Sequence, residues 1–171
     1  AMMALEKEKW KKKPESEFTT EMKDNNNILE IDNLNTYFFT DQGVVKAVNG
    51  VSFNIPLHKT VGIVGESGCG KSVTSMSVMR LLQGPQGQIA SGSIRFKAAD
   101  YKRDAKGNPI ATGTDENGKE VYETEEKIYD IAKMPMNEIH RIRGRQISMI
   151  FQEPMTSLNP VFTIGNQLDE V

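Results

Sequence analysis

The sequence has few cysteines, no long apolar run and no large net charge, and each of these absences excludes a class of protein. It has one cysteine, Cys69, so no internal disulfide can form and nothing indicates an oxidising compartment. No apolar run reaches the roughly 18 residues of a membrane span, and the N-terminus lacks the apolar core of a secretory signal. The formal net charge is −2, so the chain lacks the overall basic excess that is typical of nucleic-acid-binding proteins. These absences predict a cytoplasmic protein that reaches a membrane only through a partner.

What is present suffices for one domain with a core. The chain has 171 residues, of which 37% are hydrophobic and 26% are charged. Residues 1–27 are polar, and the lysines from Lys7 to Lys13 are mixed with glutamates. We expect a disordered tail or a marginal helix there. A basic run can also indicate nucleic acid or anionic lipid, but the neighbouring glutamates favour a solvated tail.

The rest of the chain, residues 28–171, has the apolar patterns of a mixed α/β domain. The turn signal Asp41-Gln42-Gly43 separates two apolar runs, which predicts an antiparallel pair of strands. Val61–Val64 is continuously apolar and precedes glycines, which is typical of a strand buried on both faces of a parallel sheet. The strands expected from these patterns cover residues 28–31, 34–39, 44–55, 61–64, 92–96 and 146–151.

Two helices and one insertion complete the predicted organisation. Apolar residues recur at helical spacing over residues 71–82, and Gly84-Pro85 ends that pattern. Residues 136–143 are typical of a short helix that stops at the following glycine. The polar, turn-rich stretch at about residues 98–127 is interpreted as a surface insertion, in which Asn117-Gly118 would close a hairpin.

The segment Gly65-Glu66-Ser67-Gly68-Cys69-Gly70-Lys71-Ser72 matches the phosphate-loop pattern G-x-x-x-x-G-K-[ST], known as Walker A. Its glycines let the backbone direct successive N–H groups inward, and the following helix adds its first-turn N–H groups, that of Val73 included. Lys71 would place a cation on the β- and γ-phosphates, and the Ser72 hydroxyl would bind Mg²⁺. A glycine turn without a ligand is the alternative, which the flanking strand and helix patterns disfavour. We predict that ATP binds here.

The residues around this loop resemble those of ATP-binding cassette (ABC) ATPases. Ala47-Val48-Asn49 lies upstream, and Gln146–Pro160 downstream contains Phe-Gln-Glu-Pro followed by Ser-Leu-Asn-Pro. This longer motif is similar to that of the subfamily that powers oligopeptide and dipeptide importers. The resemblance covers about residues 28–97 and 128–171. It implies an α/β P-loop cassette with an antiparallel β subdomain and part of a parallel-sheet core with its P-loop helix, while the helical subdomain and the second half of the core are missing.

The resemblance also implies roles for two residues outside the loop. In such cassettes, the glutamine at the position of Gln152 ends a core strand, reaches Mg²⁺ and the attacking water, and begins the segment that touches the membrane subunits. An aromatic residue in the position of Phe38 stacks on adenine. Tyr37 points to the other face of the strand, so only one of the two can stack. An ordinary core role for Phe38 remains open. Lys71 and Gln152 are thus the implied catalytic residues, and Ser72 and Gln152 the implied magnesium ligands.

Three features depart from the family pattern. His58-Lys59 stands where the family has Gly-Glu, and the insertion at residues 98–127 is longer than expected. The chain also stops at Val171, before the Leu-Ser-Gly-Gly-Gln signature, the Asp-Glu strand end and the switch histidine, a role that His140 cannot take because it precedes the Gln152 motif. We therefore expect that the parent protein hydrolyses ATP, whereas this segment alone binds weakly, hydrolyses little and exposes an unpaired sheet edge.

The resemblance finally implies partners and a location. Two cassettes, identical or different, would sandwich two ATP molecules, and membrane-spanning permease subunits would contact the segment after Gln152. This places the protein on the cytoplasmic face of the cell membrane, with no nucleic-acid partner. Two alternatives remain, because one fold hosts many functions. One is a non-catalytic, truncated nucleotide-binding module, and the other is a soluble ABC ATPase that acts in repair or translation.

Overall fold

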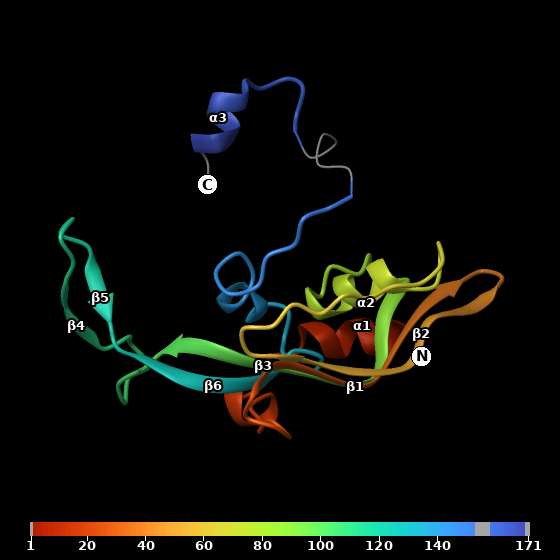
Figure 1. Ribbon diagram of the computed structural model, residues 1–171, viewed down its shortest axis with the longest axis horizontal. Helices are drawn as coiled ribbons and strands as arrows, with labels where there is room; N and C mark the ends of the chain where they lie inside the picture. Colours follow the sequence, from red (N-terminus) through yellow and green to blue (C-terminus); the bar gives the residue numbers. More distant parts are fainter. Residues whose placement is uncertain (1, 153–157, 170–171) are drawn as a thin grey trace.

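The computed structural model describes residues 2–152 and 158–169, and its centre is a four-stranded antiparallel sheet (Figure 1). Three helices accompany the sheet among the described residues, and none of them is long and apolar enough to cross a membrane. The sheet has the order β2-β1-β3-β6, with β1 at Asn27–Thr40, β2 at Gly43–Pro56, β3 at Gly87–Tyr101 and β6 at Thr124–Asp130. The helices are α1 at Met2–Trp10, α2 at Lys71–Val78 and α3 at Ile164–Asp169, with 3-10 turns at Glu15–Glu17 and Ile139–Arg141.

The predicted antiparallel pair is confirmed as the β1–β2 hairpin. Its register closes with Thr40 opposite Gly43, so the expected turn lies where the sequence places it. Strand β1 also pairs with β3, which brings Ile31 opposite Ile94. Both isoleucines are almost completely buried, at 2% and 0% exposure. These apolar residues of neighbouring strands therefore share one sheet face that packs into the core.

The N-terminal segment is part of this core. Of the two interpretations of residues 1–27, a loose tail or a marginal helix, the structure shows a helix, α1, followed by a segment that lies along the outer edge of β6. The carbonyl of Phe18 accepts a hydrogen bond from the Asp130 amide at 2.7 Å, and the Thr20 amide donates to Ile128 at 2.9 Å. The ring of Phe18 is 2% exposed and lies 5.7 Å from the ring of Tyr129. An edge strand is thereby covered by the chain itself.

Helix α2 begins where the sequence predicts but ends at Val78, four residues earlier than expected. Arg80 follows with a left-handed φ of +53°. The Arg80 amide donates to Ser77 and the Leu81 amide donates to Met76, a pattern that closes a helix. The helix therefore ends through its own C-terminal hydrogen bonds before Gly84-Pro85 is reached.

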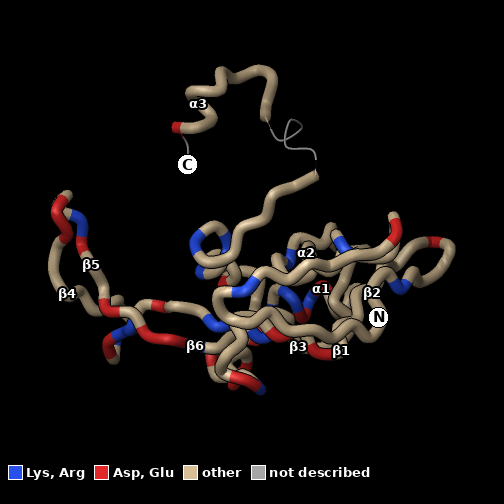
Figure 2. Tube along the Cα trace, in the orientation of Figure 1, with Lys and Arg blue, Asp and Glu red and all other residues tan. Residues whose placement is uncertain are grey.

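The predicted insertion is an arm that extends from the sheet (Figure 1). It contains a second, two-stranded sheet made of β4 at Ala111–Thr114 and β5 at Glu120–Tyr122. The turn at Asn117-Gly118 closes this hairpin as expected, because the Gly118 amide donates to the Asp115 carbonyl at 3.0 Å. Figure 2 shows that charged residues of both signs lie along the arm, which is consistent with a solvated surface element.

Two expected strands are wrong. Residues 61–64 and 146–151 form no strand, and some of their apolar side chains lie at the surface, with Val64 97% and Ile150 93% exposed. A parallel strand is held by neighbours on both sides. Among the described residues, the only pairing of either segment is an isolated bridge from Arg143 to Ile147. The partial parallel core that we expected is therefore represented by helix α2 and two segments that form no strand. The short helix expected at residues 136–143 is reduced to a 3-10 turn at Ile139–Arg141.

A buried polar cluster joins the base of the arm to the core. Tyr129 is fully buried, and its hydroxyl donates to Asp100 at 2.5 Å. The Arg141 guanidinium lies 3.6 Å from the same carboxylate. Burial alone would raise the pKa of Asp100, but the hydrogen bonds from the Tyr129 hydroxyl and the Tyr101 amide, with the Arg141 charge, outweigh it and hold that pKa below its usual 3.8. The folded state therefore favours the ionised carboxyl.

Replacement of Asp100 by asparagine tests this cluster. We expect a loss of about 1 to 2 kcal/mol in the free energy of unfolding at pH 7, since a charge-assisted hydrogen bond becomes a neutral one. A depressed pKa contributes stability above the unfolded-state value of 3.8, and that stability disappears as the pH falls through the lower folded-state value. Urea unfolding at several pH values should therefore show the gap between the two proteins closing below pH 3.8. A gap that is independent of pH would contradict the assignment.

Candidate functional site

The predicted phosphate loop connects the coil after β2 to helix α2 and lies on the surface (Figure 1, yellow to yellow-green). Gly68 and Gly70 have left-handed φ values of +79° and +95°, which glycine adopts without strain. A Cβ at Gly70 would lie 2.4 Å from the carbonyl oxygen of Ala47 in β2. The end of the loop thus packs directly on a strand backbone, and this contact positions the start of α2.

The Lys71 side chain reaches back across the loop. Its Nζ donates to the carbonyl oxygens of Gly65 and Glu66, each at 2.6 Å, and the Cys69 Sγ lies 3.6 Å away. The ammonium group is therefore held at the loop by neutral acceptors. An anionic oxygen at the same place would form a shorter and stronger charge-assisted bond.

The first turn of α2 adds further donors. No described residue accepts a hydrogen bond from the amides of Lys71, Ser72 or Val73, and the first paired amide is that of Thr74, which donates to Gly70 at 2.8 Å. The N-cap residue is a glycine, so no side chain caps these amides. The Ser72 hydroxyl is on an exposed residue beside them. Three amides, one ammonium and one hydroxyl together fit a polyphosphate with a magnesium ion.

The close approach at Gly70 gives a matched pair of substitutions. Gly70→Ala is expected to lower the free energy of unfolding by about 3 kcal/mol, since it combines a left-handed residue with a backbone clash. Gly68→Ala has a similar φ but no atom within 4 Å of the added Cβ, so we expect about 1 kcal/mol. Urea unfolding without nucleotide measures both. Equal losses would show that the contact between Gly70 and Ala47 does not hold the loop.

An apolar cavity of about 450 Å³ lies behind the loop. Its walls come from α2, from the sheet and from both segments that were expected to be strands. Ile63 lies two residues before the phosphate loop, and Ile150 lies two residues before Gln152. The residues that line the cavity include Ile63, Thr74, Val78, Ile147, Met149 and Ile150. The structure thus brings together the flanks of the two predicted motifs, although not their polar residues.

Gln152 is the last residue described before the gap at residues 153–157. Gln152 is exposed, and within the described residues it forms no hydrogen bond with the phosphate loop. The motif residues Glu153, Pro154, Met155, Thr156 and Ser157 lie outside the described residues. A role for Gln152 at a metal ion therefore stays a prediction.

Phe38 and Tyr37 have different surroundings on β1. Phe38 is half-buried, and its ring lies against Gly87, where an added Cβ would come within 2.9 Å of it. Tyr37 has the Lys46 ammonium 5.6 Å from its ring centroid, and its hydroxyl donates at 3.4 Å to Asn35 and Asn49. Both the stacking role and the core role of Phe38 remain open on this geometry.

The two histidines, His58 and His140, lie outside the phosphate loop. His58, which stands where the family has Gly-Glu, is an exposed turn residue with a φ of +57°. His140 lies on the 3-10 turn at Ile139–Arg141, with its Nδ1 2.8 Å from the carbonyl oxygen of Asn137. No cluster of three His, Cys, Asp or Glu side chains suited to a metal ion exists in the part of the chain that the structure describes.

Two arginines that the sequence analysis did not single out position α2. Arg80 is 7% exposed, and its Nη1 donates to three carbonyl oxygens in the segment after β6, those of Ile131, Ala132 and Met134. Burial lowers the pKa of Arg80 to about 10, so the group still carries its charge at neutral pH. Arg143 donates to the carbonyl oxygens of Met79 and Arg80 at 2.7 and 2.6 Å. These partners are 51 to 64 residues apart in sequence, so no local pattern indicates them.

Comparison with known proteins places the whole arrangement in a family. A sequence model described as "ABC transporter" matches residues 48–170. The chain is 43% identical over 144 residues to the oligopeptide transport ATP-binding protein AppD of Bacillus subtilis, covering 84% of this chain and 35% of that protein. It is 40% identical over 143 residues to the dipeptide transport ATP-binding protein DppD of the same organism, with 84% and 34% covered.

A third relative is named for a different transported molecule, glutathione. The glutathione import ATP-binding protein GsiA of Shigella dysenteriae is 36% identical over 147 residues, covering 86% of this chain and 20% of that protein. The chain thus spans about a third or less of the length of the curated relatives it matches. The matched region contains the phosphate loop, helix α2 and the Gln152 segment. The expected fold class, the N-terminal part of an ABC cassette, is confirmed, and the chain belongs to the ABC transporter family.

Proposed function

We propose that this chain is part of the ATP-binding subunit of an ABC importer for oligopeptides or dipeptides, and that it binds MgATP through residues 65–73. One observation carries the proposal. The Lys71 ammonium and three amides without a described acceptor converge at the start of α2, within a chain of the ABC transporter family. The names of two relatives, oligopeptide and dipeptide transport ATP-binding proteins, support the substrate class.

Nucleotide binding would proceed by exchange of hydrogen-bond partners. The Lys71 ammonium leaves the carbonyl oxygens of Gly65 and Glu66 and binds oxygens of the β- and γ-phosphates, a change from neutral to anionic acceptors. The amides of Lys71, Ser72 and Val73 bind phosphate oxygens at the positive end of the helix. Glycine at positions 68 and 70 maintains the backbone that makes this approach possible.

The ion would be held mainly by the nucleotide. Mg²⁺ usually keeps several waters and takes only one or two protein ligands beside phosphates. The exposed Ser72 hydroxyl supplies one ligand, and we propose the Gln152 amide oxygen as a second. The ion neutralises charge that develops on the phosphates during hydrolysis. Lys71 holds the transferred group by charge, and Gln152 would orient the attacking water.

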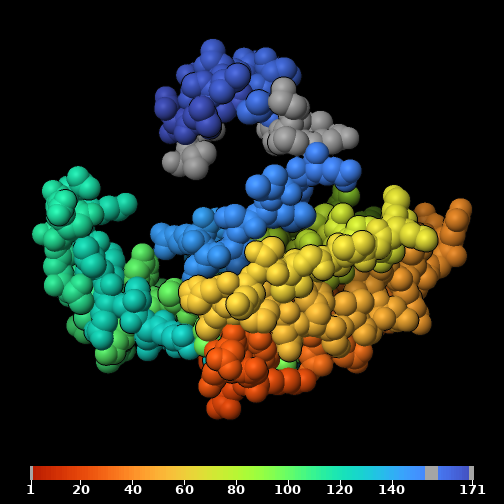
Figure 3. Space-filling view, in the orientation of Figure 1, coloured from red at the N-terminus to blue at the C-terminus, as the bar shows by residue number. Residues whose placement is uncertain are grey.

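Coupling to transport would use the segment after Gln152. Five apolar side chains of that segment are exposed, at fractions from 39% to 82%, namely Leu158, Val161, Phe162, Ile164 and Leu168. In Figure 3 residues 158–169, drawn in dark blue, lie apart from the body of the protein. Exposed apolar groups of this kind favour a protein partner. We propose that permease subunits bind here, that two ATP-binding subunits act together, and that the protein works at the cytoplasmic face of the membrane.

A calorimetric titration of the 171-residue chain with MgATP tests nucleotide binding. We expect measurable heat with MgATP and MgADP, but much weaker binding of AMP, because AMP lacks the phosphates that the loop would hold. Omission of Mg²⁺ should weaken ATP binding. Equal affinity for AMP and ATP, or no heat with any of them, would contradict the proposal.

A further inference from the structure

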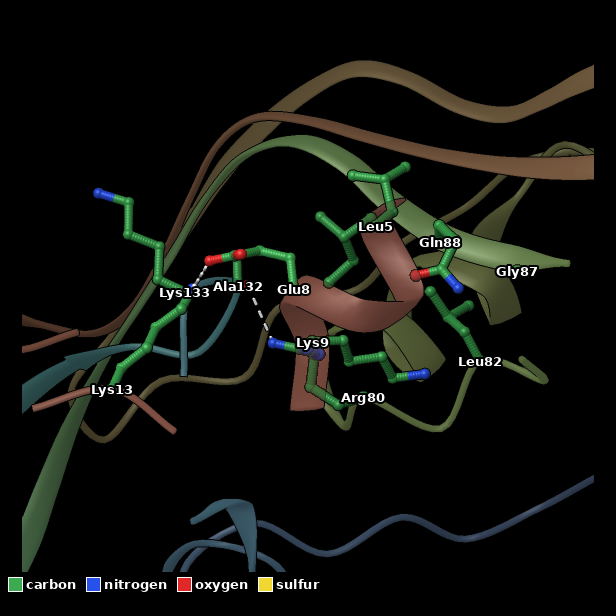
Figure 4. Close-up of a pocket in the computed structure, with 11 residues that line it drawn as sticks. Leu5, Glu8, Lys9, Lys13, Arg80, Leu82, Gly87, Gln88, Ala132 and Lys133 are labelled. Atoms are coloured by element: carbon green, nitrogen blue, oxygen red, sulfur yellow. Dashed lines mark hydrogen bonds and ion pairs between the residues drawn. The ribbon is translucent and has the colours of Figure 1, made fainter. Parts of the chain in front are cut away.

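One face of helix α1 is fixed to the protein. The Glu6 carboxylate accepts a hydrogen bond from the Gln88 side chain at 2.5 Å, and the Lys9 carbonyl accepts one from the Met136 amide at 3.1 Å. Leu5, Glu8 and Lys9 lie around a small cavity together with Leu82 and Gln88, as Figure 4 shows. The helix therefore has a defined orientation and is not a free tail.

The side of the helix next to this fixed face is exposed and apolar in part. Met3 is 60% and Trp10 is 58% exposed. These two residues and Lys7 are spaced four and three residues apart, so they share one side of the helix. Met3 and Trp10 also line a surface groove of about 550 Å³ with Leu82, Pro85 and Met136. The Trp10 Nε1 donates to Glu6 at 2.8 Å, which fixes the direction of the indole ring.

Lysines surround this apolar face. Residues 2–13 contain five lysines and two glutamates. Lys9 pairs with Glu6 and Lys13 pairs with Glu8, at 3.6 and 2.8 Å. No ion pair is recorded within the described residues for the three others, which are all exposed, Lys7, Lys11 and Lys12. The positive charge of this surface is thus not neutralised by the protein.

We propose that the exposed face of α1, with Lys7, Lys11 and Lys12, binds the surface of an anionic phospholipid bilayer. Trp and Met would lie at the boundary between headgroups and acyl chains, while the lysines pair with lipid phosphates. Such a contact would orient the subunit on a membrane independently of permease subunits. The proposal goes beyond the proposed ATPase function and does not depend on nucleotide binding.

Charge and exposure favour lipid over other acidic partners. The chain as a whole has a net charge of −2, so the positive charge is local to α1. Nucleic acid could also pair with the lysines, but it gains nothing from an exposed methionine. An acidic peptide could pair with the lysines, but it would not carry the indole ring into a hydrocarbon environment. That difference can be measured.

Trp10 is the only tryptophan of the chain, so its fluorescence reports on α1 alone. The complete 171-residue chain is mixed with vesicles of phosphatidylcholine, with or without about 30% phosphatidylglycerol. We expect co-sedimentation and a blue shift of Trp10 emission with the anionic vesicles only, and reversal by about 0.5 M salt. The triple substitution of Lys7, Lys11 and Lys12 to Gln should weaken binding by roughly 100-fold.

A control variant with the same change of net charge shows whether vesicle binding depends on the lysines near α1 or only on the total charge of the protein. It replaces Lys59, Lys106 and Lys119 by Gln, three exposed lysines outside α1, and it should bind vesicles like the unchanged protein. Equal weakening in both variants, or equal binding to neutral vesicles, overturns the proposal. So does vesicle binding without a shift of Trp10, or displacement of the vesicles by a single-stranded oligonucleotide that quenches Trp10, which would assign the face to nucleic acid.

Discussion

Replacement of Lys71 by alanine is expected to lower the affinity of the chain for MgATP by roughly 100-fold, measured by calorimetric titration. The reason is the position of its ammonium group. The ammonium nitrogen lies 2.6 Å from two carbonyl oxygens of the loop, so it is already positioned to bond phosphate oxygens that enter the loop. A charge-assisted hydrogen bond to phosphate contributes about 1.5 to 3 kcal/mol. In the parent protein we expect hydrolysis to fall further, because charge on the transferred group grows in the transition state.

The control for this substitution is Lys119→Ala, an exposed lysine of the arm with the same change of charge. It should leave the affinity unchanged within a factor of about two, because surface charges far from the site are screened by salt. Urea unfolding without nucleotide should show that neither variant loses more than about 0.5 kcal/mol. Unchanged affinity of the folded Lys71 variant would remove the foundation of the proposed function.

The backbone of the glycine loop before α2 and the β1–β2 hairpin were predictable because both are determined by residues close together in the sequence, while phosphate binding by that loop stays a prediction. A left-handed φ at Gly70 permits the loop backbone whatever the rest of the protein does. The turn at Asp41–Gly43 similarly brings two adjacent strands together at little entropic cost. The same reasoning placed Asn117-Gly118 at the tip of the arm. Local chemistry was sufficient in all three cases.

The errors arose where distant residues decide the outcome. Val61–Val64 has the composition of a buried strand, but composition does not supply the neighbouring strands that pairing requires. The residues that follow α2 are held from far along the chain, because the Arg143 side chain donates to the carbonyl oxygens of Met79 and Arg80, 64 and 63 residues away. The N-terminal segment, for which a disordered tail or a marginal helix is expected, is joined to the sheet by the buried side chains of Phe18 and Met22 and by backbone bonds to β6, none of which its polar composition indicates.

Phe18→Ala is expected to lower the free energy of unfolding by about 4 kcal/mol, measured by urea unfolding of the complete chain. The side chain is 2% exposed and packs against Tyr129, so its removal leaves a cavity beside a fully buried ring. The backbone bonds of Phe18 and Thr20 to β6 would remain possible, but without the ring they hold an edge segment with little apolar burial. The Tyr129 hydroxyl bond to Asp100 should weaken as well, because water then reaches it.

Phe162→Ala deletes the same side chain at a position that is 58% exposed, and it should change the free energy of unfolding by less than about 0.5 kcal/mol. Phe18→Leu should lie between the two variants, since leucine keeps part of the buried volume. Hydrogen exchange gives an independent measure, because the Asp130 amide donates to the Phe18 carbonyl and should lose protection in the alanine variant. Equal stability of the Phe18 and Phe162 variants would mean that β6 is an open edge in solution, and that residues 14–22 do not belong to the domain.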